Sequence, residues 1–202
     1  AWWAHLYGGF EVPSFRLFGH KVAIRRTIEA GGRVDGGVDA VGFFNAEHGI
    51  GEAARLLVEA IQTTDIPVST TGYRNTESRQ RANFETDEVG KYKTLIVAIN
   101  AELNKPVRDL FGAQFFEGTY VIGQWFWELE YFPPSMHMGF NYVNEVWSPT
   151  KFITKAIDKY APNTVKVNKM QLPLLAPEYD TEINKIDIGV EPDRYMFFFT
   201  FS

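Results

Sequence analysis

The chain has 202 residues, of which 45% are hydrophobic and 15% aromatic, and its formal net charge is −5. This length suits one sizeable α/β domain and is too short for two complete ones. The acidic balance excludes a typical nucleic-acid-binding face, and the lack of cysteine excludes disulfides and thiolate metal sites.

Residues 1–35 differ from the rest of the chain because they interleave aromatic residues with arginine and lysine. Glycine pairs at 31–32 and 36–37 mark a linker at the end of this stretch. We interpret 1–35 as an N-terminal extension or a linker from an upstream region. We expect it to pack on the domain or to belong to an upstream domain, with peripheral contact at a membrane surface as the alternative.

From residue 36 onward, short apolar runs alternate with stretches of helical periodicity. Enrichment in β-branched residues predicts strands at 38–44, 66–71, 93–99, 119–124, 144–147 and 164–168. Strands that alternate with helices of this length indicate a Rossmann-like α/β domain with a doubly wound parallel sheet, which we expect over 36–170.

Two helices have specific signals. The stretch 50–63 predicts a helix that turns Ala53, Leu57, Ala60 and Ile61 toward the sheet. Ser148 followed by a proline predicts an N-cap and first residue of a later helix that runs to about residue 160.

The end of the chain has a different composition. Residues 171–193 are polar with scattered prolines, which is typical of an interdomain linker, and "RYMFFFTF" at 194–201 predicts the first strand of a C-terminal domain. We therefore expect the chain to be a piece of a larger protein, truncated before that second domain.

A glycine-rich turn separates the first strand from the first helix. Gly49, Gly51 and Ala54 fit G-x-G-x-x-A, where a helix N-terminus offers unpaired N–H groups and a positive dipole end to a phosphate. The same pattern also occurs in a tight turn with no ligand. A dinucleotide site expects an acidic residue after the second strand, whereas Arg74 is present here, which leaves an NADP-dependent oxidoreductase as an alternative.

A second unusual segment is "YVIGQWFWELEYFPP", which follows a predicted strand. It places Trp125, Trp127, Glu128 and Glu130 at the carboxyl edge of the sheet, where open α/β sheets bind ligands. Aromatic rings can stack on sugar faces while carboxylates accept sugar hydroxyls. The alternative is that the two tryptophans pack in the core and the glutamates are only solvated.

Three segments occur in order between 38 and 157: "VGFFNAEHGIGEAARLLVEAI", "YVIGQWFWELEYFPP" and "VNEVWSPTKFITKAI". Together they resemble the N-terminal half of a family-four (group 1) glycosyltransferase of the GT-B fold. The resemblance implies transfer of a sugar, with retention, from a nucleotide-sugar donor to a glycan or lipid-linked acceptor, without a cofactor or an obligatory metal. It implies that this half shapes the acceptor side of the cleft in a cytoplasmic enzyme, with the inner face of the membrane as a possible contact of 1–35.

The same resemblance assigns residues. It implies that Gly49, Ile50 and Gly51 face the donor phosphate, and it assigns no catalytic residue. Asn100 and Glu102 stand where many relatives have a histidine. The substrate-binding residues that it implies are Glu47, Asn100, Glu102, Trp127, Glu128 and Glu130. A non-catalytic carbohydrate-binding module remains a further alternative to the transferase and the oxidoreductase.

Overall fold

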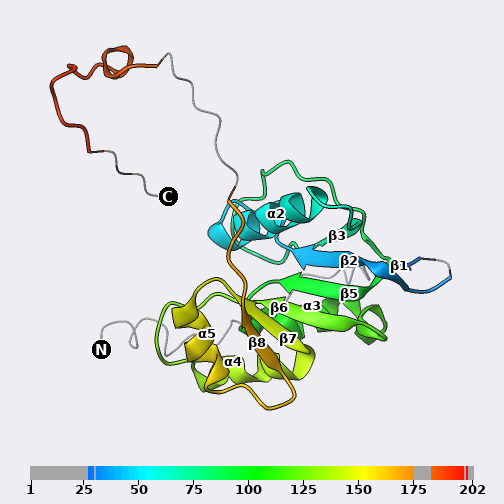
Figure 1. The fold of residues 1–202 in the computed structure, drawn as a ribbon. Coiled ribbons are helices and arrows are strands. Elements are labelled where there is room, and N and C mark those ends of the chain that lie inside the picture. Colours follow the sequence, from blue (N-terminus) through cyan, green and yellow to red (C-terminus); the bar gives the residue numbers. More distant parts are fainter. Residues whose placement is uncertain (1–26, 30, 175–182, 198, 200–202) are drawn as a thin grey trace.

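The centre of the computed structural model is a parallel sheet of six strands in the order β3-β2-β5-β6-β7-β8 (Figure 1). The structure describes residues 27–29, 31–174, 183–197 and 199. The sheet confirms the predicted α/β class, and each strand overlaps a predicted one. Its strands are β2 (Val34–Gly42), β3 (Val68–Gly72), β5 (Tyr92–Ala98), β6 (Tyr120–Gln124), β7 (Glu145–Ser148) and β8 (Lys166–Lys169). A short parallel pair, β1 (Thr27–Ile28) and β4 (Val89–Gly90), forms a second sheet.

Helices lie on both faces of the sheet, as a Rossmann-like arrangement requires. The α-helices are α2 (Gly49–Gln62), α3 (Asn104–Phe111), α4 (Pro134–His137) and α5 (Lys151–Asp158). Single 3-10 turns are η1 (Ala101–Leu103), η2 (Ala113–Phe116), η3 (Met138–Tyr142) and η4 (Lys185–Ile188). In the described part of the chain, no helix is both long and apolar enough to cross a membrane.

Alternation along the strands divides the core into two clusters. On one face, Ala40 and Ile96 pack with Leu57 and Val58 of α2. The opposite face carries Val41, Leu95, Val97 and Val121 of the strands together with Val107 and Phe111 of α3 and Ile157 of α5. Of the four residues predicted for the buried side of α2, Ala53 and Leu57 are buried, while Ala60 and Ile61 are only half-buried at its C-terminal end.

The predicted N-cap of the last helix was wrong by two residues. Ser148 is the final residue of β7, and its hydroxyl shares a hydrogen bond with Thr154 Oγ1 at 2.8 Å. Thr150 is the N-cap, because its Oγ1 accepts a hydrogen bond from the Ile153 N–H at 3.2 Å. The strand extends far enough to include Ser148, so the cap moves to the next hydroxyl residue.

The structure also differs from expectation at the start of the domain and near the end of the chain. Most of 1–35 lies outside the described residues, but β1 and the start of β2 are described, so the expected boundary at 35/36 falls inside a strand of the sheet. No strand is assigned among the described residues of 194–201. A strand requires hydrogen-bonding neighbours, and Tyr195 and Phe197 are 94% and 96% exposed there.

A buried ion pair braces the amino end of the central strands. Asp39 in β2 is 2% exposed and accepts hydrogen bonds from the Lys91 and Tyr92 N–H groups at 3.0 and 3.1 Å. The Arg33 guanidinium donates to the same carboxylate, to the Tyr92 carbonyl at 2.7 Å and to the Phe115 carbonyl. Burial raises the pKa of Asp39, and the two N–H donors and the Arg33 charge oppose that rise. The pair thus joins β2, β5 and η2.

Removing the Asp39 carboxylate should therefore be costly. Asp39→Ala leaves a buried guanidinium without its counter-charge, and we expect a loss of about 3–5 kcal/mol in the free energy of unfolding. The matched control is Lys93→Met, which removes an ion pair to Asp35 whose side chains are 49% and 81% exposed; it should cost about 1 kcal/mol or less. Urea unfolding of both variants measures the difference, and equal losses would contradict the bracing role.

Candidate functional site

The sheet changes its winding direction between β2 and β5. The chain passes from β2 outward to β3 and then continues at β5, on the other side of β2. In open parallel sheets, ligands bind outside the carboxyl ends of the strands at such a point. The segments that follow β2, β5 and β6 meet at this edge. They contain every predicted site residue: Glu47, Gly49, Ile50, Gly51, Asn100, Glu102, Trp127, Glu128 and Glu130.

His48 caps the helix that begins at the glycine turn. It is the N-cap of α2, and its Nδ1 accepts the N–H of Gly51 at 3.0 Å. The ring lies edge-on to Phe43, with 4.9 Å between ring centroids. Burial lowers the pKa of His48, and the nearby Arg55 charge lowers it further. The ring is therefore neutral at pH 7, which its role as a hydrogen-bond acceptor requires.

The surroundings of the two glycines of the turn, Gly49 and Gly51, differ. A Cβ at Gly51 would lie 2.7 Å from the carbonyl oxygens of both Phe43 and Ala46, so close packing accounts for this glycine. A Cβ at Gly49 would meet nothing within 4 Å. Because His48 already occupies the Gly51 N–H, the predicted phosphate contact depends on the first two amides of the helix, those of Gly49 and Ile50.

Arg55 holds the turn in shape, a role that the sequence pattern did not reveal. Its Nη1 donates to the carbonyls of Phe44 and Ala46 at 2.8 and 3.0 Å, and its Nη2 pairs with Glu52 at 2.6 Å. Glu47 pairs instead with Arg79 at 3.0 Å. The loop ahead of α2 is therefore built by side chains that satisfy its own backbone carbonyls.

The segment after β5 is tied to the segment after β6. Asn100 Oδ1 accepts the N–H of Phe126 at 2.9 Å, so this predicted binding residue positions its neighbour's backbone. Glu102 is the middle residue of the short η1 turn and lies at the surface. Desolvation by neighbouring atoms raises the pKa of Glu102.

The two tryptophans of the Trp–Glu segment have different environments. Trp125 is fully buried and packs against Phe132 and Phe140, so it belongs to the core. Trp127 is half-buried, and its Nε1 donates to the Tyr131 carbonyl at 2.8 Å. Glu128, Leu129 and Glu130 lie between these two anchored ends and are exposed. The segment thus presents two carboxylates and an indole on a short loop closed by a hydrogen bond.

Two further polar side chains, His137 and Arg74, lie in other segments of the chain. His137 ends α4, is half-buried and contacts the Phe132 carbonyl through Nε2 at 3.1 Å. Arg74 follows β3 and is exposed. Within the described residues, no three histidine, aspartate or glutamate side chains gather as metal ligands would.

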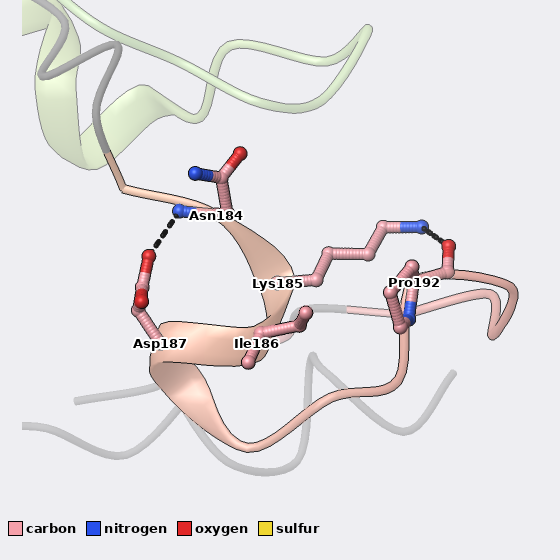
Figure 2. A pocket seen from close by; sticks show the side chains of 5 residues that line it. All are labelled: Asn184, Lys185, Ile186, Asp187 and Pro192. Atoms are coloured by element: carbon pink, nitrogen blue, oxygen red, sulfur yellow. Dashed lines mark hydrogen bonds between the residues drawn. The ribbon is translucent and has the colours of Figure 1, made fainter.

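Two surface hollows lie away from this edge. One, of about 490 Å³, is formed by residues of a single stretch around η4 (Figure 2). Lys185 Nζ crosses it to donate to the Pro192 carbonyl at 3.3 Å, while Asp187 accepts the Asn184 N–H at 2.7 Å. The other, of about 340 Å³, opens beside the start of β6 near Arg108, at the amino edge of the sheet. Neither contains a predicted site residue.

The His48 cap should make stability depend on pH. Since the folded-state pKa lies below the unfolded value of about 6.5, the cap's contribution is complete above that pH and is lost as pH falls through the folded pKa. An N-cap contributes about 1 kcal/mol. His48→Asn keeps a capping side chain that does not titrate, so the free energy of unfolding of the wild type should fall more steeply between neutral and mildly acidic pH. Parallel curves for the two proteins would contradict the capping role.

The two glycines should respond oppositely to the same substitution. Gly51→Ala forces a methyl group against two carbonyl oxygens and should lower the free energy of unfolding by about 1–3 kcal/mol. Gly49→Ala adds its methyl group in open space at the first helical residue and should be neutral or stabilise by up to about 1 kcal/mol. Thermal and urea unfolding report both effects, and a similar loss in both variants would show that the turn packs differently.

Comparisons of the chain with protein-family models, with curated proteins and with solved structures find no match in any of the three.

Proposed function

We propose that this chain is the N-terminal, acceptor-side part of a retaining, group 1 glycosyltransferase of the GT-B fold that uses a nucleotide-sugar donor. One observation supports this above the others. The glycine turn, the residues after β5 and the Trp–Glu segment are separated in sequence by about fifty and twenty-five residues, yet the topology brings them to one edge, beside the point where the winding changes.

The groups at this edge suit a sugar and a phosphate. The Trp127 ring offers an apolar surface to a pyranose face, and the exposed Glu128 and Glu130 carboxylates can accept hydroxyl protons in hydrogen bonds. The amides of Gly49 and Ile50 lie at the positive end of the fourteen-residue α2 helix, which favours a negatively charged group. The Asn100–Phe126 hydrogen bond fixes the start of the Trp–Glu segment against the residues that follow β5.

The chemistry of transfer demands more than this edge provides. Negative charge develops on the leaving diphosphate, and preorganised donors that stabilise such charge usually make the largest contribution to catalysis. The turn supplies two backbone donors on one side only. In the proposed enzyme the remaining donors and the exclusion of water come from a C-terminal domain that closes over the cleft. The proposal therefore assigns positioning to this domain and most charge stabilisation to the other.

The test compares two proteins, residues 1–202 and the longer polypeptide that the proposal requires. Each is incubated with a panel of UDP-, GDP- and dTDP-sugars, and release of the product nucleotide is measured. We expect turnover by the longer polypeptide and none by residues 1–202. Turnover by residues 1–202 alone would contradict the two-domain mechanism, and a rise in melting temperature with NADPH but with no sugar nucleotide would favour the oxidoreductase.

A variant of the longer polypeptide tests the glycine turn itself. Gly49→Val fills open space at the phosphate-facing end of α2, so it blocks a ligand without disturbing the fold. We expect the KM for the donor to rise about tenfold or more, since a hydrogen bond to a charged group contributes roughly 1.5–3 kcal/mol. Gln62→Val, at the exposed far end of the same helix, is the matched control and should leave KM unchanged. Equal kinetics in both variants would remove the turn from the site.

A further inference from the structure

One half of the sheet has an open face. On the side that faces α2, strands β6, β7 and β8 present Tyr120, Glu145, Trp147, Lys166 and Asn168, as the parallel register requires. Tyr120, Lys166 and Asn168 are exposed, while Glu145 and Trp147 are half-buried. We call these five residues the β6–β8 face.

Side chains on this face hold one another in place. The Glu145 carboxylate accepts hydrogen bonds from Tyr120 Oη at 2.9 Å, from Trp147 Nε1 at 2.6 Å and from Asn168 Nδ2 at 2.8 Å. Partial burial raises the pKa of Glu145, but these three donors outweigh it and the net direction is downward. The face is therefore a surface of two aromatic rings around an ionised carboxylate. Its side chains are held in place by hydrogen bonds within the described domain.

Among the described residues, no helix covers this face. Helix α2 packs over β2, β3 and β5, whereas α5 packs on β7 and β8 from the opposite side, where Val146 and Ile157 are buried. All-parallel sheets occur almost entirely with both faces covered, because both sides of each strand are built to be buried. The β6–β8 face breaks that rule, so another segment must be sought.

We propose that the N-terminal segment 1–26 packs on the β6–β8 face and completes the second layer over the sheet. The composition of the segment suits the task, because it contains Trp2, Trp3, Tyr7, Phe10, Phe15 and Phe18. Its net charge is opposite in sign to that of the rest of the chain, while the face itself carries one charge of each sign, Glu145 and Lys166. Of the 20 basic and 25 acidic residues of the chain, four basic and one acidic lie in 1–26, so residues 27–202 carry a net charge of −8.

The segment has the length to reach the face. It joins the described domain at Thr27 in β1, which pairs with β4, and β4 in turn contacts β3 at the edge of the sheet opposite β8. From β3 to β8 are five strand spacings, about 24 Å at about 4.8 Å each. Twenty-six residues span about 39 Å even as a helix. At the other end of the chain, Tyr195 and Phe197 are almost fully exposed, so that described stretch does not occupy the face.

The chain contains no cysteine, so a single introduced thiol reports one position without background. Lys166→Cys places a thiol on the β6–β8 face, and Lys155→Cys places a matched thiol at an exposed position of α5 on the opposite side. Each is combined with the native segment and with Phe15→Asp/Phe18→Asp, and the rate of maleimide labelling is measured in the full chain. We expect Lys166→Cys to react about tenfold faster or more once the segment is charged, since a covered site reacts only when it opens locally. Lys155→Cys should react equally in both.

Three results would overturn the proposal. Equal rates at Lys166→Cys with both segments would leave the face uncovered by 1–26. Protection that disappears on dilution would assign the face to a second copy of the chain. Co-sedimentation with anionic lipid vesicles that depends on 1–26, with Lys166→Cys fully reactive in their absence, would assign the segment to a membrane.

A second measurement avoids the substitutions in the aromatic cluster. Spin labels at Lys166→Cys and Ser14→Cys in the otherwise native chain should give one narrow distance distribution, because a packed segment has one position relative to the sheet. A broad distribution would overturn the proposal even if the charged variant failed to fold.

Discussion

The Asp39 carboxylate is the point on which the arrangement of the central strands depends. It lies inside a sheet where water cannot solvate it, so the backbone of β5 and the Arg33 guanidinium must do so. These hydrogen bonds fix the position of β2 relative to β5 along the strand direction. The bond from Arg33 to the Phe115 carbonyl connects η2 to both strands. Because the amino edge is held in this way, the carboxyl edge is free to be made of loops, which is where chemistry-bearing residues are found in such sheets.

The carboxyl edge is stabilised by a different means. Arg55 satisfies carbonyls of the loop before α2, His48 satisfies an amide of its first turn, and Asn100 satisfies the amide of Phe126. Each is a polar side chain that serves a backbone group which no strand or helix partner could serve. The same residues thus set the geometry that the proposed sugar and phosphate contacts would use.

Local patterns predicted what depends on neighbours in sequence. Runs of β-branched residues located all six strands of the sheet, and glycine spacing located the start of α2. Contacts between distant segments were not predictable in this way. Arg33 was assigned to an extension because its partner Asp39 lies beyond two glycines. The sequence pattern around Gly51 is the same whether a phosphate or the Ala46 carbonyl lies against this glycine. Trp125 and Trp127 share a motif, and only the tertiary structure separates the buried ring from the half-exposed one.

The closed loop from Phe126 to Tyr131 has a consequence for how such a domain could diversify. Its backbone is anchored at one end by Asn100 and at the other by the Trp127 indole, so neither anchor involves the side chains at 128–130. Those three positions are exposed and contribute nothing to the core. Mutation can therefore exchange charge, size and polarity there at little cost to folding, while the main chain keeps its course. The loop is a site where ligand preference can drift over generations independently of the stability of the domain that supports it.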